Sequence, residues 1–197
     1  MLIDLHCHTR VYSACSALTP DALVRAARAR GLDGVVLTEH DALWPLDEIE
    51  RLRRELDFVV LRGVEVTTDA GHVLVYGLHA FSACGTLDEL SGLVEAQGAL
   101  MFLAHPGRSY GTAAIDIPSR FASVESQNGT EGLLQNDNAS AVARRCALPG
   151  IGGSDAHSVR EAGVCATRFS RPVSDEASLM EALRAGAYSA CRLPAST

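Results

Sequence analysis

Short apolar segments alternate with helix-like segments along this chain, and this alternation limits the fold more than any other feature. Strand-like runs are expected at 2–7, 34–38, 58–67, 72–78, 99–104, 121–126, 150–153 and 164–169. Helical patterns are expected at 20–30, 46–56, 87–96, 135–146 and 175–185. Repeated β-then-α units predict an α/β fold with a largely parallel sheet. Six or seven units are too few for an eight-stranded barrel, so a smaller or distorted barrel is expected.

The ends of the helices and the length of the chain support this organisation. Thr19 and Pro20 form an N-cap and a first helical residue, and Ser174 is expected to cap the last helix. The 197 residues contain no repeat, low-complexity tract or obvious linker. We therefore expect one domain over 1–197.

Titratable residues follow or open most of the predicted strands. His6 and His8 end the first strand, and their i, i+2 spacing places both on one face, with Cys7 on the other. The carboxyl ends of barrel strands meet on one face, so side chains far apart in sequence are expected to share one bowl. The full set is His6, His8, His40, Glu65, His72, His105, Asp155 and His157.

Six imidazoles and two carboxylates in one bowl would be costly unless they share cations. Imidazole and carboxylate suit Zn, Mn, Fe or Co. Eight ligands exceed one tetrahedral shell, so two or three ions are expected, with Glu65 as a bridge. A single histidine is more often a packing or surface residue than a ligand, and His79 is interpreted in that way.

Charge and composition exclude several other functions. All 17 cationic residues are arginine, so lysine Schiff bases and phosphate-loop lysines are excluded. The net charge of −7 argues against a stable nucleic-acid partner and against polybasic membrane binding. No apolar run approaches a membrane span and the first residues do not resemble a signal peptide, so a cytoplasmic protein is expected. In that compartment the six cysteines are expected to be free thiols.

Six short motifs, in this order, resemble the PHP (polymerase and histidinol phosphatase) family. They are DLHCHT at 4–9, TEHD at 38–41, GVEVT at 63–67, GH at 71–72, AHP at 104–106 and GSDAH at 153–157. The resemblance implies a distorted (β/α)7, TIM-like barrel that hydrolyses phosphate esters with two or three metal ions. It implies one ion held by His6, His8, Glu65 and Asp155, a second held by Glu65, His72 and His105, and a third held by His40 and His157.

Two positions depart from the family pattern. Many members have an Asp or His shortly after the first motif as a further ligand of the third ion, but residues 10–16 contain neither. Cys15 or a water could take that place, or the third site could be weak. Glu39 stands where the family usually has Asp, which suggests a supporting role behind the ligands.

Other polar residues are expected around the metal ions. Arg108 is interpreted as a phosphate ligand, against the alternative of a solvated loop arginine. Arg10 is expected at the mouth of the bowl, and Asn128 either contacts substrate or only forms a turn. Asp4 is expected to orient a ligand imidazole, and Asp41 to support a ligand or face substrate.

Three functions compete on this evidence. The favoured one is a phosphoesterase acting on a phosphomonoester, nucleotide or related small substrate with metal-activated water, and with Glu65, Asp155 and His157 as catalytic residues. The alternatives are a non-catalytic, regulatory metal-binding PHP module and a related amidohydrolase. The absence of lysine excludes an amidohydrolase with a carboxylated-lysine bridge. The substrate, the choice among Mn, Fe and Zn, and the oligomeric state stay open.

Overall fold

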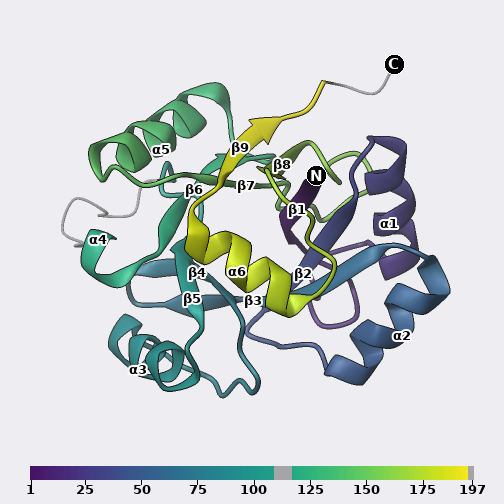
Figure 1. Cartoon of the computed structure of the whole chain (residues 1–197), viewed down its shortest axis with the longest axis horizontal. Coiled ribbons are helices and arrows are strands. Elements are labelled where there is room, and N and C mark those ends of the chain that lie inside the picture. Colours follow the sequence, from purple (N-terminus) through teal and green to yellow (C-terminus); the bar gives the residue numbers. More distant parts are fainter. Residues whose placement is uncertain (109–116, 195–197) are drawn as a thin grey trace.

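A mixed sheet, nearly closed into a barrel, organises the computed structural model, which describes residues 1–108 and 117–194 (Figure 1). The strands run in the spatial order β7-β6-β5-β4-β3-β2-β1-β8-β9. Their bounds are Leu2–Cys7 (β1), Gly34–His40 (β2), Val59–Thr68 (β3), Gly71–Tyr76 (β4), Leu100–Leu103 (β5), Ser123–Asn128 (β6), Ile151–Gly153 (β7), Cys165–Phe169 (β8) and Tyr188–Arg192 (β9). The helices are Pro20–Ala29 (α1), Leu46–Leu56 (α2), Leu87–Gln97 (α3), Ile117–Arg120 (α4), Leu133–Arg145 (α5) and Glu176–Ala185 (α6).

The pairing of the strands is more mixed than the sequence predicts. β1, β2 and β3 pair in parallel, as do β5, β6 and β7. β4 pairs antiparallel with both β3 and β5, and β8 pairs antiparallel with β1 and β9. A tight turn at 69–70 joins β3 directly to β4, which leaves no room for the helix that a parallel crossover requires. The prediction of a largely parallel sheet is therefore wrong in detail, whereas the α/β barrel is confirmed.

The barrel approaches closure where β7 meets β1. A parallel bridge joins Cys7 to Ala156, and the Asp155 N–H donates to the His6 carbonyl at 2.6 Å. Gly153 permits this approach, because a Cβ placed there would lie only 2.2 Å from the Cβ of His6. The first and last of the six short motifs are thereby brought side by side.

An apolar cluster fills one part of the barrel and α6 lies across it (Figure 1). Leu5, Leu61 and Leu74 from the strands are buried in the same cluster as Leu179 and Leu183 of α6. Two further clusters lie outside the sheet, one under α1 and α2 and the other under α3 and α5. Because apolar side chains occupy the α6 end, the polar strand ends gather at the other.

Three details differ from the sequence prediction. The N-cap of α6 is Asp175, whose carboxylate accepts the Ser178 N–H at 2.8 Å, whereas Ser174 lies one residue outside. The strand β9 was not predicted, since its alternating burial is weak and its pairing with β8 creates it. The short α4 was also not predicted.

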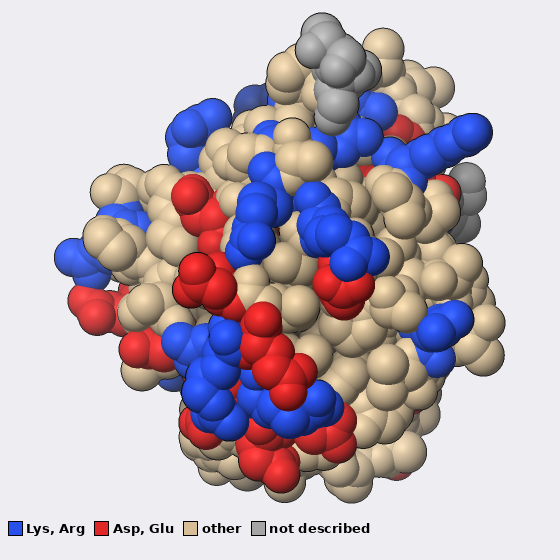
Figure 2. All heavy atoms as spheres, turned by 90° about the vertical axis from the view of Figure 1, so that its right-hand side faces the viewer, with Lys and Arg blue, Asp and Glu red and all other residues tan. Residues whose placement is uncertain are grey.

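The face over α1 and α2 carries both signs of charge (Figure 2). Arg25 pairs with Asp21 on α1, and Arg51 pairs with Glu55 on α2. Within residues 1–108 and 117–194, no helix has the length and apolar character needed to cross a bilayer.

Candidate metal centre

A β-bulge in β1 aims both histidines of the first motif into the bowl. Ile3 and Leu5 both lie in the interior cluster, so uninterrupted alternation would place Cys7 inside as well. The register with β2 shifts between Asp4 and Cys7, and this bulge reverses the alternation. Cys7 then packs outside the sheet, its thiol donating to the Val36 carbonyl, while His6 and His8 lie fully buried inside. The predicted shared face of the two histidines is what the structure has.

Glu65 lies at the centre of a ring of five imidazoles. Its Oε2 atom is 3.2 Å from His6 Nε2, 3.1 Å from His8 Nε2 and 3.1 Å from His40 Nδ1. Its Oε1 atom is 2.9 Å from His72 Nδ1 and 3.1 Å from His105 Nε2. The residues of this contact set lie on or just after five strands, β1, β2, β3, β4 and β5.

Burial and close charges act on these groups in opposite directions. Burial raises the pKa of Glu65, but the surrounding imidazoles, His6 first, outweigh it and hold that pKa well below its usual range. Burial lowers the pKa of His6, but Glu125, Glu65 and Asp155 outweigh it and raise the pKa well above its ordinary value. Burial lowers the pKa of His40, in spite of the attraction of Glu65. The carboxylates of the bowl therefore favour a positive charge at His6, whereas burial prevails at the half-buried His40.

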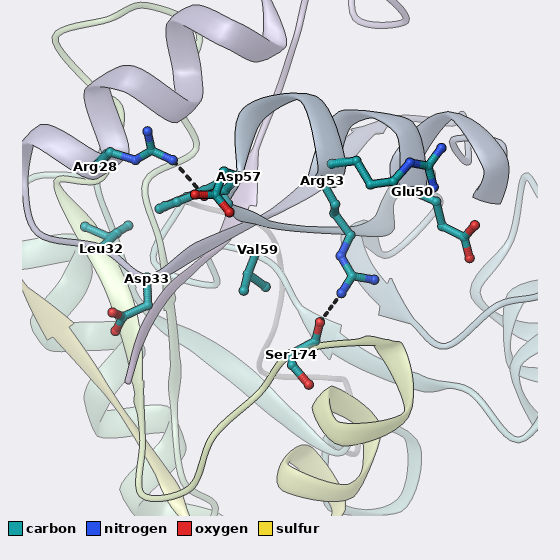
Figure 3. Close-up of a pocket in the computed structure, with 10 residues that line it drawn as sticks. Arg28, Leu32, Asp33, Glu50, Arg53, Asp57, Val59 and Ser174 are labelled. Atoms are coloured by element: carbon teal, nitrogen blue, oxygen red, sulfur yellow. Dashed lines mark hydrogen bonds between the residues drawn. The ribbon is translucent and has the colours of Figure 1, made fainter.

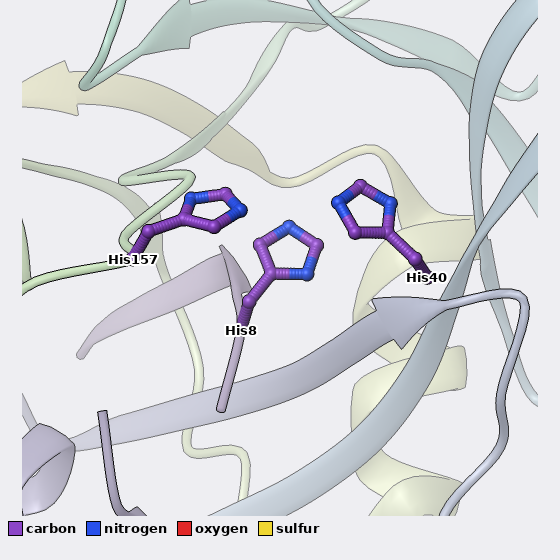
Figure 4. A group of neighbouring side chains, drawn as sticks. All are labelled: His8, His40 and His157. Atoms are coloured by element: carbon purple, nitrogen blue, oxygen red, sulfur yellow. The ribbon is translucent and has the colours of Figure 1, made fainter. Parts of the chain in front are cut away.

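The donor set fits divalent metal ions. Three groups have all their ligand atoms within 4.8 Å of one another: His6, His8, Glu65 and Asp155; His40, Glu65 and His72; and His8, His40 and His157 (Figure 4). Two buried atoms, Glu65 Oε2 and His105 Nδ1, have no hydrogen-bond partner. A buried carboxylate oxygen without a donor, facing three imidazole nitrogens, is costly unless a cation lies among them.

The first group reproduces the ligand set that the family resemblance implies for one ion. His105 is outside the three groups, although its Nε2 contacts Glu65. His40 takes part in the group with His72 as well as in the group with His157. The exact division of ligands among ions stays a prediction.

Glu125 is a buried residue of this centre that the sequence reasoning missed. Its Oε1 accepts from His6 Nδ1 at 2.9 Å, and its Oε2 accepts the His105 N–H at 2.9 Å and Asn128 Nδ2 at 3.0 Å. It therefore fixes the tautomer that leaves His6 Nε2 facing the bowl. A glutamate in the middle of an apolar strand pattern, at 121–126, was the available signal.

Asp4 was expected to orient an imidazole in this way, and the structure corrects that prediction. Its carboxylate accepts the backbone N–H groups of His6, Ser154 and Gly163, at 3.2, 2.8 and 3.2 Å. Burial raises its pKa to about 6, although these donors oppose the shift. Asp4 thus ties β1 to the segments around β7. It faces away from the imidazoles because it precedes the bulge in β1.

Asn128 and Arg108 surround Asp155. Asn128 is 1 % exposed, and its Nδ2 donates to both Glu125 and Asp155, at 3.0 and 3.3 Å. Its Oδ1 accepts from Thr130, so Asn128 positions Asp155, and its contact with substrate stays a prediction. Arg108 donates to Asp155 Oδ2 at 2.9 Å, to Thr130 Oγ1 at 2.7 Å and to Glu131. Its guanidinium lines the cavity, and its contact with phosphate stays a prediction.

The remaining singled-out residues lie further from the ligands. Glu39 accepts from Thr9, Ser13 and Trp44 and so supports the loop after β1. Asp41 accepts the Thr67 N–H at 2.9 Å. Arg10 is exposed after β1.

Five of the eight predicted metal ligands line a cavity of about 300 Å³. Its walls are Cys15, His40, Glu65, His72, Arg108, Thr130, Asp155 and His157. A second, larger hollow of about 770 Å³ lies between α1 and α2 (Figure 3). Two of its three arginines already donate to carbonyls, Arg28 to that of Asp57 and Arg53 to that of Ser174. The hollow lies by the starts of β2 and β3, away from the histidines. The smaller cavity is therefore the candidate site.

The Glu125→Gln variant is expected to bind metal about 10–100-fold more weakly, as is usual when the carboxylate behind a ligand imidazole is lost. Glutamine keeps the volume but cannot supply two equivalent acceptors to His6 and to the His105 N–H. Metal content and affinity, measured by titration of the chelator-treated protein, check this. Gln127→Ala on the same strand is the control and should leave affinity unchanged; equal losses in the two variants would contradict the assignment.

Comparisons with known proteins agree with this geometry. The PHP domain family model matches residues 4–131, and the PHP-associated family model matches residues 134–188. A 5'-3' exoribonuclease of Haemophilus influenzae is 30% identical over 99 residues, which are 49% of this chain and 34% of the relative. The chain thus matches about a third of that enzyme's length.

Two solved structures share the fold. A candidate metal-dependent phosphoesterase of Bifidobacterium adolescentis superposes with a TM-score of 0.65 at 19% identity, covering 92% of this chain and 95% of the other. An amidohydrolase of Chromobacterium violaceum superposes with a TM-score of 0.69 at 19% identity, covering 96% and 97%. At this identity they establish the architecture alone.

Proposed function

This chain belongs to the PHP family, and on that premise we propose that it is a metal-dependent phosphoesterase that hydrolyses a small phosphorylated substrate. We propose a single domain over 1–197 and a centre of two or three divalent ions, with Mn, Fe and Zn as candidates. The ligands would be His6, His8, His40, Glu65, His72, His105, Asp155 and His157.

The arrangement of five imidazole nitrogens around Glu65, all within 3.2 Å, carries this proposal. One carboxylate cannot satisfy the hydrogen-bonding capacity of five imidazole nitrogens, and its Oε2 has no hydrogen-bond donor. A module with a purely structural role has no need of such a costly polar cluster beside an open cavity. Divalent ions held there would activate water and neutralise charge on a phosphoryl group.

The protein's own residues supply binding and orientation. Arg108 is held by Glu131 and Thr130, so its guanidinium is fixed at the cavity wall before substrate arrives. The Nδ1 of His157 donates to the Asp155 carbonyl at 2.9 Å, which leaves Nε2 to act as a ligand or to accept a proton. Asp155 is fixed by Asn128 and Thr130 from behind.

The size of the cavity favours a small substrate or the end of a larger one. A volume of about 300 Å³ holds a phosphate with part of its alcohol group. The match to an exoribonuclease supports a second candidate, a phosphodiester at a nucleic-acid end. The predicted lack of a stable nucleic-acid partner therefore needs its own test.

A substrate panel tests the function. Purified protein loaded with Mn, Fe or Zn is assayed on aryl phosphate monoesters, nucleoside monophosphates, an aryl phosphodiester, 5'-phosphorylated RNA and an aryl amide. We expect metal-stimulated hydrolysis of at least one phosphate ester and none of the amide. Stable metal binding without any hydrolysis would support the non-catalytic module instead.

Arg108→Ala is expected to raise KM for a phosphate substrate by about 10–100-fold, the equivalent of losing a charged hydrogen bond of roughly 1.5–3 kcal/mol. Lysine at this position should restore only part of the loss, because it cannot form two parallel bonds to phosphate. Steady-state kinetics are recorded and the metal content of the same sample is measured. Together they distinguish a loss of phosphate binding from damage to Asp155. Arg25→Ala on the exposed face of α1 is the control. An unchanged KM would remove Arg108 from the substrate site.

A further inference from the structure

Three stacked histidines form a ligand group that is short of one protein ligand. His8 packs against His40 with ring centroids 4.4 Å apart and against His157 at 4.5 Å, and it lies between the two (Figure 4). Their ligand atoms lie within 4.8 Å of one another. Three nitrogens leave the fourth position of a tetrahedral ion to another group.

The cavity wall limits which residue can fill that position. Of its other members with ligand atoms, Glu65, His72 and Asp155 belong to the neighbouring groups, which also share His8 and His40 with this one. Thr130 is bonded to Asn128 and Asp155, and Arg108 cannot bind a cation. Among the lining residues, Cys15 alone has a ligand atom that no other group uses.

The loop that carries Cys15 is bonded to the segment of each of the three histidines. Ser16 Oγ donates to the His8 carbonyl at 3.0 Å, and the Ala17 N–H donates to the His157 carbonyl at 2.9 Å. The His40 N–H donates to Ser13 Oγ at 3.1 Å. Cys15, between Ser13 and Ser16, is therefore held beside the three imidazoles.

A second observation points to a cation in the same cavity. The Glu65 side chain is 1 % exposed. Its Oε2 has no hydrogen-bond donor and lies 3.1 Å from His40 Nδ1. Cys15 differs from the other cysteines in its exposure: Cys7 and Cys165 are buried, and Cys84, Cys146 and Cys191 are half-buried.

We propose that Cys15 is the fourth protein ligand of an ion held by His8, His40 and His157. In the structure its Sγ is outside the 4.8 Å group, so ligation requires the exposed Cys15 side chain to move toward the three imidazoles. The thiol loses its proton to solvent and the thiolate sulfur binds the ion. Such a site prefers Zn²⁺ or Co²⁺ to Mn²⁺, because thiolate is a soft ligand.

The inference rests on the metal-binding part of the proposed function, and its test reads coordination without measuring hydrolysis. Co²⁺ is titrated into the full chain after chelator treatment under reducing conditions, and the absorption spectrum is recorded. Wild-type protein should develop the near-ultraviolet charge-transfer band of a thiolate bound to Co²⁺. Cys15→Ser should lose that band and keep the visible bands of cobalt held by nitrogen and oxygen.

Two further variants make the result specific. Cys84→Ser should keep the charge-transfer band, whereas Cys15→Asp should retain the bound cobalt without it. Survival of the band in Cys15→Ser, or its absence from wild type at saturation, would overturn the proposal. Failure to bind any Co²⁺ would reject the whole metal centre, whereas visible bands without the charge-transfer band would reject Cys15 alone.

Discussion

Replacing Glu65 with glutamine is expected to remove most of the metal from the protein and to lower kcat by roughly a thousand-fold, because several kcal/mol of charge stabilisation are lost with the metal. The substitution preserves the size of the side chain, so the barrel should still fold. It replaces the central anion by a neutral amide, whose NH₂ group would face imidazole nitrogens within about 3.2 Å. Both effects oppose cation binding.

Elemental analysis, thermal unfolding and phosphate-ester hydrolysis together check this expectation. Glu95→Gln on the exposed side of α3 is the matched control, since it makes the same chemical change and reduces the net charge equally. Retention of a full complement of metal by Glu65→Gln would show that the five imidazoles do not share their cation through this carboxylate. A variant that fails to fold is identified by its unfolding curve and is replaced by Glu65→Asp.

Replacing Gly153 with alanine is expected to lower the free energy of unfolding by about 3 kcal/mol or more and to weaken metal binding as well. The added Cβ would meet the His6 Cβ at 2.2 Å and its backbone nitrogen at 2.7 Å. The neighbour is the backbone of β1, which cannot rotate away as the end of a flexible side chain could. Relief of the clash must separate β7 from β1, and this moves His6 relative to Asp155.

Gly92→Ala provides the comparison, because the same methyl group is added on an exposed face of α3 where no atom lies within 4 Å. Alanine is a better helix former than glycine, so this variant should be neutral or more stable by up to about 1 kcal/mol. Chemical denaturation curves of both variants give the difference. Equal stabilities for the two variants would contradict the close approach of β7 and β1.

The gathering of candidate metal ligands at strand ends could be predicted from the sequence, because it depends only on which residues follow or open each apolar run. Each ligand follows or opens an apolar run, and the carboxyl ends of neighbouring parallel strands necessarily meet at one edge. The structure places His6, His8, His40, Glu65 and Asp155 there together. Arg108, beside the ligand His105, lines the same cavity.

Roles that depend on which atom faces which neighbour could not be predicted. Glu125 and Asp4 are both buried carboxylates near His6, yet only Glu125 reaches the imidazole. The register shift in β6 between Glu125 and Gln127, and the bulge in β1, decide this. Neither irregularity has a local sequence signal, because a bulge is determined by how two strands pair.

Imidazoles and carboxylates recur at predicted strand ends of an α/β chain with no lysine, and from this local pattern alone a centre of shared cations could be predicted. Long-range contacts place five imidazoles around one carboxylate, make β4 antiparallel and close β7 on β1 through a glycine. The two kinds of feature differ in the distance along the chain over which they act. Alternation and capping act over a few residues, whereas the coordination geometry of a metal centre is fixed by contacts such as that between His6 and Asp155, about 150 residues apart along the chain.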